Sequence, residues 1–413
     1  VNASSTVGHP DNRFARGTAS LHARLVRSSW SSAWLGIGGV TVVACSAVPP
    51  ATPPPTQVAS ASTEPADSQP LNFQQGDFDQ ALLAARNSGK LLFVDAWAPW
   101  CHTCLSMRET VWNRRELGRF ASQFEFLEID TDKPEALSFV ERYPLRVWPT
   151  FLVFDPVTRE IVASYGGSMS LEETASFLER AAVSKATPEP GHNELALAHR
   201  EAQLGNYANA ESSYRRAAAL LPAGVSKEAV AGLLQMLVAQ KQHDRCVDEG
   251  VALSDNVRGS SARVDVLLQI LRCSSEADAA HKEAGQRHVS ERLPRLIEQP
   301  AEGASVDDRS DAMGAWAEWL DQQGRKAEAR ALQEKRLQLL ESTALAADTP
   351  AQAQVHDYQR MLTYLALGRG EEAVTMLEAR CKEFPDNYEP PARLAFTLIE
   401  LGRYEAALAP LAR

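Results

Sequence analysis

An apolar run that leads directly into two closely spaced cysteines constrains the fold of this chain more than any other feature. Residues 91–97 (LLFVDAW) are suited to a buried central strand. Cys101 and Cys104 follow in the segment Pro-Trp-Cys-His-Thr-Cys, and a helical pattern then extends from Leu105 to Phe120. The sequence therefore places both cysteines where a strand gives way to a helix.

This placement indicates redox chemistry. A thiolate is the nucleophile in disulfide exchange, and the unpaired N–H groups at a helix start stabilise the anion. We expect Cys101 to attack a partner and Cys104, one helical turn later, to resolve the mixed disulfide. The competing interpretation is half of a zinc site, which needs a second pair at ligand spacing. The sequence holds no other CxxC, CxxH or HxxxH pattern, so we expect no metal and no cofactor.

The surrounding segments predict one α/β domain over residues 71–184. Helices are expected at 77–87, 105–120, 134–143 and 171–183, and strands at 91–97, 124–130, 150–154 and 161–165. This order of elements predicts an α/β sandwich in which helices flank one mixed central sheet.

The cysteine segment resembles the thioredoxin superfamily. The family pattern V-D-x-W-A-x-W-C-x-x-C is matched by residues 94–104. The resemblance implies a thioredoxin-like domain that acts as a protein disulfide oxidoreductase on protein thiol and disulfide clients. It also implies that Asp95 is a buried carboxylate behind the disulfide, which exchanges a proton with Cys104. The alternative is an aspartate that only accepts local backbone hydrogen bonds.

Two further segments extend the resemblance. Residues 146–150 (RVWPT) resemble the family's cis-proline loop, which implies that Pro149 faces the disulfide and pairs with an extended substrate. Gly166 resembles the glycine that lets a partner backbone approach closely. The resemblance thus implies a catalytic set of Cys101, Cys104, Asp95 and Pro149, and a substrate-binding set of Trp100, His102, Trp148 and Gly166.

The chain departs from the family pattern between the cysteines, where His102 and Thr103 replace the Gly-Pro of reducing thioredoxins. A protonated His102 would stabilise a Cys101 thiolate and make the pair more oxidising, whereas a neutral one would not. The continuation after Cys104, which lacks a proline, is similar to periplasmic thioredoxin-like domains that reduce envelope disulfides.

The first 45 residues are predicted to be a targeting signal. Residues 33–44 (AWLGIGGVTVVA) are too short to span a membrane as a helix but suit the apolar region of a secretory signal. The segment ending at Cys45 resembles the bacterial lipobox, which implies lipidation of Cys45, and Ser46 favours the outer membrane. The alternative is a poor signal-anchor or an unstructured apolar tail.

The next segment, residues 46–70, holds seven prolines and almost no large apolar side chain. Such a composition cannot bury enough surface to fold, so we predict a disordered, extended tether. The chain carries a net charge of −11 and has no polybasic run. Nucleic acid is therefore excluded as an expected partner, and membrane contact is expected through the lipid alone.

Beyond a short linker at 185–191, residues 192–413 are predicted to form helical repeats. A Leu-Gly motif with alanine five residues after the glycine occurs at Gly205, Gly368 and Gly402, with a related copy at Gly324. The 34-residue spacing between Gly368 and Gly402 resembles the tetratricopeptide repeat. We expect an all-helical solenoid that recruits a protein or peptide. The alternative is a region that only separates two partners.

Three other cysteines and two tryptophans lie in the repeats. Cys246 and Cys273 are on adjacent predicted helices, and we hypothesise that they form a structural disulfide. Cys381 is expected to be a small core residue. Trp316 and Trp319 are expected to pack in the core rather than bind a ligand.

Together these patterns predict a lipid-anchored thiol–disulfide oxidoreductase of the bacterial cell envelope, facing the periplasm. A narrower version delivers electrons to apocytochrome or another dedicated client. The alternative from a different class is a non-catalytic scaffold lipoprotein, in which the thioredoxin-like fold and the repeats serve only as docking surfaces.

Overall fold

The computed structural model describes residues 70–145, 147–186, 190–221, 227–300 and 304–412. The predicted signal segment with Cys45 and nearly all of the proline-rich tether lie outside the described residues, as does Arg146 of the proline loop.

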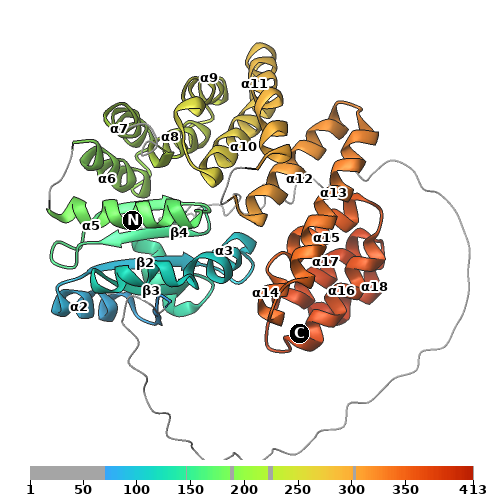
Figure 1. Ribbon diagram of the computed structural model, residues 1–413, viewed down its shortest axis with the longest axis horizontal. Coiled ribbons are helices and arrows are strands. Elements are labelled where there is room, and N and C mark those ends of the chain that lie inside the picture. Colours follow the sequence, from blue (N-terminus) through green and yellow to red (C-terminus); the bar gives the residue numbers. More distant parts are fainter. Residues whose placement is uncertain (1–69, 146, 187–189, 222–226, 301–303, 413) are drawn as a thin grey trace, which may run out of the picture. The chain divides into compact units, whose positions relative to one another are not determined.

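A five-stranded mixed sheet forms the centre of the first described domain (Figure 1). Its spatial order is β1-β3-β2-β4-β5, built from β1 (Phe73–Gln75), β2 (Leu91–Trp97), β3 (Phe124–Asp130), β4 (Thr150–Phe154) and β5 (Ile161–Gly166). β3 runs parallel to β1 and β2, whereas β4 is antiparallel to both β2 and β5. The predicted mixed sheet is confirmed. β1 was not expected, because three residues are too few to show an alternating pattern.

Alternation along β2 divides the core between the two faces of the sheet. Leu92, Val94 and Ala96 join a cluster with the apolar side chains of α2 (Phe78–Ser88) and α4 (Leu137–Arg142). Phe93 belongs to the opposite cluster, beneath the helices that follow Cys101 and beneath α5 (Leu171–Ala186). Asp95 continues this second series, so its carboxyl lies on the face that the cysteine-bearing helix covers.

The helix expected at 105–120 is instead three helical segments. α3 spans His102–Met107, the π-helical η2 spans Arg108–Trp112, and the 3₁₀-helical η3 spans Arg115–Ser122. Arg114 is extended, with φ −80° and ψ 125°, and this residue ends the continuous helix. The prediction was wrong because Trp112, Leu117 and Phe120 all enter one core, so the apolar pattern continues through the break.

Similar refinements occur at two other predicted helices. The segment 134–143 divides into η4 (Pro134–Ala136) and α4. α5 continues to Ala186, three residues beyond its expected end, and the next helix already begins at Pro190. The expected linker at 185–191 therefore overlaps two helix ends.

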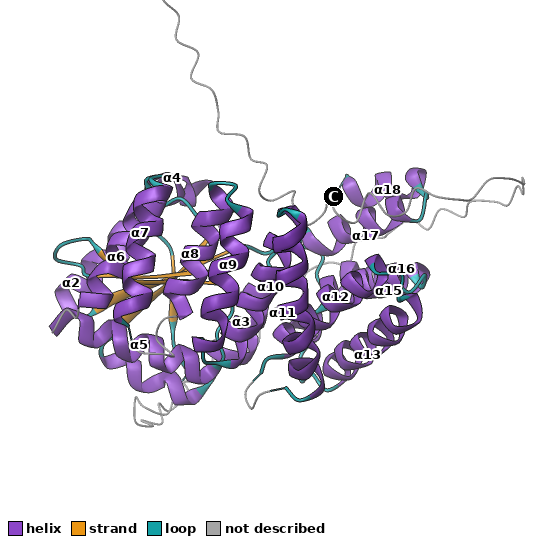
Figure 2. Cartoon of the chain, turned by 90° about the horizontal axis from the view of Figure 1, so that it is seen from above, coloured by secondary structure: helices purple, strands orange, loops and turns teal. Residues whose placement is uncertain are grey.

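Helices make up the described chain from residue 190 onward, and the strands, orange in Figure 2, are confined to the preceding domain. The helices are α6 (Pro190–Gln203), α7 (Tyr207–Leu220), α8 (Lys227–Ala239), α9 (His243–Leu253), η5 (Ser254–Asn256), α10 (Ser260–Glu276), α11 (Ala279–Glu298), α12 (Val306–Gln322), α13 (Lys326–Leu345), α14 (Pro350–Gln354), α15 (Asp357–Ala366), α16 (Gly370–Glu383), α17 (Glu389–Glu400) and α18 (Tyr404–Leu411). The predicted all-helical region is confirmed, whereas its assignment as tetratricopeptide repeats stays a prediction.

The repeated glycine motif has the local geometry that the sequence predicted. Gly205, Gly324, Gly368 and Gly402 each have a positive φ, between 73° and 79°, in the turn between two helices. A side chain is strained in this left-handed conformation, which explains why glycine occupies the position. The alanine five residues later is buried in each case, at Ala210, Ala329, Ala373 and Ala407. Its small size lets the two helices approach closely.

Two further predictions concern the interior of the helical region. Cys246 of α9 and Cys273 of α10 are joined in a disulfide, which confirms the hypothesis drawn from their spacing. Trp316 and Trp319 stack on each other within the core, with ring centroids 4.3 Å apart, and so contribute to packing. None of the helices among the described residues combines the length and apolar character needed to cross a membrane.

Candidate active site

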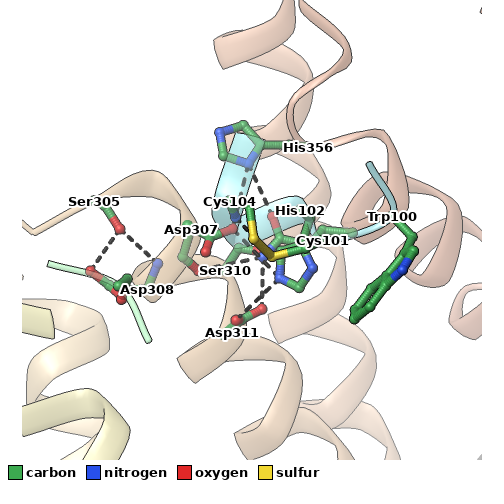
Figure 3. A network of polar contacts seen from close by, with 12 residues as sticks. Trp100, Cys101, His102, Cys104, Ser305, Asp307, Asp308, Ser310, Asp311 and His356 are labelled. Carbon is green, nitrogen blue, oxygen red and sulfur yellow. Dashed lines mark hydrogen bonds and ion pairs between the residues drawn. A yellow bond between two sulfur atoms is a disulfide. The ribbon is translucent and has the colours of Figure 1, made fainter. Parts of the chain in front are cut away.

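The two cysteines lie at the start of α3, where the sequence placed them. Cys101 is the N-cap residue, and its Sγ accepts a hydrogen bond from the backbone N–H of Cys104 at 3.0 Å. The two sulfurs form a disulfide, drawn in yellow in Figure 3. When this bond is reduced, the same N–H and the helix dipole would stabilise negative charge on Cys101. The geometry therefore provides Cys101 with a backbone donor for negative charge on its sulfur.

Cys101 is buried, with an exposed fraction of 5%. Residues of the helical region contact its neighbours on both sides. Arg393 of α17 donates to the carbonyl oxygen of Trp100 at 3.5 Å, and the ring of Tyr358 on α15 stacks on His102 at 5.4 Å. Trp100 itself remains 38% exposed. The helical region thus limits access to the disulfide.

His102 is held by two carboxylates of α12, as Figure 3 shows. Its Nε2 lies 3.6 Å from Oδ1 of Asp307 and 3.5 Å from Oδ2 of Asp311. Burial lowers the pKa of His102, but the charge of Asp307 and the hydrogen bond and charge of Asp311 outweigh burial, so that the pKa is raised overall. His102 therefore pairs with acidic residues of the same chain, and its expected role toward a substrate stays a prediction.

Sequence analysis missed both carboxylates. Asp307 and Asp311 lie far along the chain from His102, in a segment without a recognisable motif. Their spacing of four residues on α12 places them on one helix face, but such acidic pairs are common on solvated helices. Only the packing of α12 against the start of α3 gives the pair a role.

Two carboxylates and one buried guanidinium lie around His102. Arg336 of α13 lies 3.9 Å from Asp311, whose pKa is lowered, whereas burial raises the pKa of Asp307 to about 7, so Asp311 is the carboxylate that stays ionised throughout the neutral range. His356, 3.9 Å from Asp307, is neutral at pH 7 because burial lowers its pKa to about 4. His102, Asp307 and Asp311 are close enough to hold a metal ion, but the adjacent arginine favours an ion-pair cluster over a dication site.

Asp95 is buried, with an exposed fraction of 2%. Its Oδ2 accepts a hydrogen bond from Nε1 of Trp112 at 3.1 Å, whereas its Oδ1 has no hydrogen-bond partner among the described residues. Burial is the largest influence on the pKa of Asp95 and raises it. The negative charge of Glu128 raises this pKa further, whereas Arg108 and the hydrogen bond from Trp112 lower it, and the net result is a pKa of about 7. A carboxyl of this kind can hold or release a proton at neutral pH.

The proline loop has the backbone that the resemblance implied. The peptide bond between Trp148 and Pro149 is cis. Trp148 packs with the two cysteines in a small apolar cluster, and its Nε1 donates to Oγ1 of Thr131 at 2.9 Å. The structure thus brings Trp148, and with it the proline loop, to the disulfide.

Gly166 lies at the end of β5 beside the same loop. A β-carbon at this position would be 2.4 Å from Cγ1 of Val147, so glycine is required by the packing of the chain itself. The neighbouring Gly167 N–H donates to the carbonyl oxygen of Pro149 at 2.9 Å. The contact that Gly166 makes possible in this structure is therefore with Val147, and its expected role toward a substrate stays a prediction.

Comparisons with known proteins agree with this geometry. A family model described as thioredoxin-like matches residues 72–156. Thioredoxin-1 of Drosophila melanogaster is 37% identical over 93 residues, which cover 22% of this chain and 78% of that protein. The thiol:disulfide interchange protein DsbD of Pseudoalteromonas atlantica is 32% identical over 90 residues, or 21% of this chain, but the match covers only 15% of DsbD.

Among solved structures, a thioredoxin from Thermus thermophilus is similar over 29% of this chain and 95% of its own length, with 24% identity and a TM-score of 0.27. The sequence relationship is the stronger finding, since Thioredoxin-1 is matched over most of its length and the residues matched by the family model include both cysteines. Through the domain that contains Cys101 and Cys104, the chain belongs to the thioredoxin family.

Proposed function

We propose that this protein is a thiol–disulfide oxidoreductase that exchanges disulfides with protein clients through Cys101 and Cys104. The observation that carries the proposal is the Cys101–Cys104 disulfide at the start of α3, where Cys101 Sγ accepts the N–H of Cys104. The named activity of DsbD, thiol:disulfide interchange, supports the same chemistry.

The exchange transfers two electrons in two steps. With the pair reduced, the Cys101 thiolate attacks a client disulfide, forms a mixed disulfide and releases one client thiolate. The Cys104 thiolate then attacks Cys101 Sγ, which reforms the intramolecular disulfide and releases the second client thiolate. Asp95 would accept the Cys104 proton in this second step. The reverse sequence oxidises a client dithiol, and the reduction potential of the pair decides the direction.

Trapping of the mixed disulfide tests this function. We expect the Cys104→Ser variant of the full chain to accumulate a client-linked adduct, because Cys101 can attack but nothing can resolve the product. The Cys101→Ser variant should form no adduct and should lose insulin reduction by at least about 100-fold. Non-reducing electrophoresis and mass spectrometry read the adduct. Partner capture that persists when both cysteines are replaced would instead indicate the non-catalytic scaffold.

We further propose that a lipid on Cys45 holds the protein at the cell envelope, facing the periplasm. The apolar segment before Cys45 supports this location, as does the Cys246–Cys273 disulfide, because structural disulfides persist in oxidising compartments. In cells supplied with labelled palmitate, the wild-type chain should carry the label and Cys45→Ser should carry none. Label that survives this substitution would overturn the proposal. The helical region is proposed to hold clients or partner proteins.

A further inference from the structure

The contacts of His102 connect the redox-active pair to the helical region. His102 is the first residue of α3, directly after Cys101, and its side chain is 22% exposed. Its Nε2 faces Asp307 and Asp311 of α12, whose side chains are 3% and 36% exposed. By distance and angle, neither Nε2 of His102 nor Oδ1 of Asp307 makes a hydrogen bond among the described residues, so the contact between these two atoms is an ion pair. Burial raises the pKa of Asp307 to about 7 and the positive charge of His102 lowers it, so the imidazolium stabilises the ionised carboxylate.

We propose that Asp307 and Asp311 are positioning residues of the redox centre, which fix the orientation and the positive charge of His102 beside Cys101. This inference rests on the proposed function and assigns the helical region a part in setting the redox properties of the pair. The carboxylates act only through His102, and they exchange no electrons or atoms with the disulfide.

The other charged and titratable groups around His102 are consistent with an imidazolium. Arg336 of α13 faces Asp311 and Arg393 of α17 faces Trp100 and the Tyr358 ring. His356, which precedes α15, is neutral, and the phenol of Tyr358 is also neutral because burial raises its pKa. Asp307 and Asp311 are thus the carboxylates that oppose the positive charge of His102.

The sign of the effect on the disulfide follows from the charges. An imidazolium beside Cys101 stabilises the thiolate of the reduced pair, so it makes reduction of the disulfide more favourable. A neutral imidazole would give no such stabilisation. Replacing His102 should therefore matter only while Asp307 and Asp311 keep it charged.

The first test is the titration of His102 in the oxidised full-length protein, followed by NMR of its ring protons. We expect the midpoint to fall by about one pH unit in Asp307→Asn or Asp311→Asn, and further in the double variant. Asp311 is partly exposed, so its variant is expected to fold even if the buried Asp307 variant does not. Unchanged His102 midpoints would overturn the proposal.

A second acid-paired histidine supplies the control in the same spectrum. His281 lies 2.8 Å from Asp278, and this hydrogen bond raises its pKa. Asp278→Asn should lower the midpoint of His281 and leave His102 unchanged, while Asp311→Asn should do the reverse. If His102 titrates only after a chelator is added, the three residues share a metal ion and the proposal is wrong.

The second test is the equilibrium of the Cys101–Cys104 pair with glutathione at pH 7. In the wild-type background, His102→Gln should make reduction of the disulfide about tenfold less favourable, which corresponds to about 30 mV. In the Asp307→Asn, Asp311→Asn background the same replacement should change the equilibrium less than about twofold. Equal effects in both backgrounds would overturn the proposal. Glutathione needs no protein client, so this result stands apart from the success or failure of the proposed function.

Discussion

Asp95→Asn is expected to stabilise the protein above pH 7 and to slow its disulfide exchange. The side chain is buried on the face of β2 that α3 and η2 cover, and its pKa is raised to about 7, chiefly by burial. Ionising this carboxyl therefore opposes folding. Asparagine keeps the acceptor for the Trp112 N–H and never becomes charged.

The direction of the pH dependence follows from linkage. The folded-state pKa of Asp95 is raised from 3.8 to about 7, so the folded state holds the proton of this carboxyl more tightly than the unfolded chain does. The resulting contribution to the free energy of unfolding is complete below pH 3.8 and is lost as the pH rises through 7. The free energy of unfolding of the wild type should thus fall, relative to Asp95→Asn, between these values. Each pKa unit is worth about 1.4 kcal/mol, so we expect an advantage of about 2–4 kcal/mol for the variant at pH 8. Urea titrations from pH 4 to 9 measure it.

The same substitution removes the proposed proton acceptor of Cys104. Resolution of the mixed disulfide should slow by about 10- to 100-fold at pH 7, and the loss should shrink at higher pH, where Cys104 ionises without help. Stopped-flow kinetics of a preformed mixed disulfide isolates this step. An Asp95→Asn variant that resolves the adduct at the wild-type rate would exclude Asp95 from the proton transfer.

Glu128→Gln is the matched control for both measurements. Glu128 is the β3 partner of Asp95 in the sheet register and forms an ion pair with Arg108. Its negative charge raises the pKa of Asp95, whereas Arg108 lowers it. Removing Glu128 should therefore move the stability step to lower pH without abolishing it. Complete loss of the stability step in Glu128→Gln would show that Glu128, and not Asp95, causes it.

Removing the disulfide of the helical region should have an effect of similar size. Cys246 and Cys273 are fully buried and 27 residues apart, so their bond restricts the unfolded chain. Replacing both with alanine should lower the free energy of unfolding by about 2–4 kcal/mol. Chemical denaturation under oxidising conditions measures the loss, and exchange through Cys101 should persist where the variant is folded.

Cys381→Ala controls for the loss of buried sulfur. Cys381 is 8% exposed on α16 and takes part in neither disulfide. Its replacement should cost less than about 1 kcal/mol, because it removes packing but no cross-link. Equal losses in Cys381→Ala and in the double alanine variant would show that the Cys246–Cys273 bond contributes nothing beyond packing.

Local patterns were enough to predict where the two cysteines lie, whereas the roles of the site residues stay predictions. Cys101 and Cys104 carry their chemistry in their position between an apolar strand and a helix, and Asp95 and Pro149 follow from the family pattern around them. Tertiary contacts account for what the sequence could not supply. Asp307 and Asp311 become partners of His102 only because α12 packs against α3, and nothing in their own segment indicates it.

The burial of Cys101 also could not be predicted from the residues near it in the sequence. The sequence around Cys101 gives no sign that Arg393 and Tyr358, on two helices much later in the chain, contact the residues on either side of it. The helix expected at 105–120 was misjudged for a related reason. Trp112 of the π-helical segment and Phe120 of the 3₁₀-helical segment enter the same core. The apolar residues therefore keep a helix-like spacing in the sequence although the helix is interrupted.

The long separation in sequence between His102 and Asp311 has a consequence for biosynthesis. At the proposed location the chain enters the periplasm N-terminus first, so the cysteine pair emerges there well before α12, and domains generally fold in the order in which they emerge. The nascent thioredoxin-like domain can thus close its disulfide while His102 still faces solvent. The reduction potential of the pair would change only when α12 docks, so a product truncated before α12 and the full chain would differ in reduction potential although they share every cysteine of that domain.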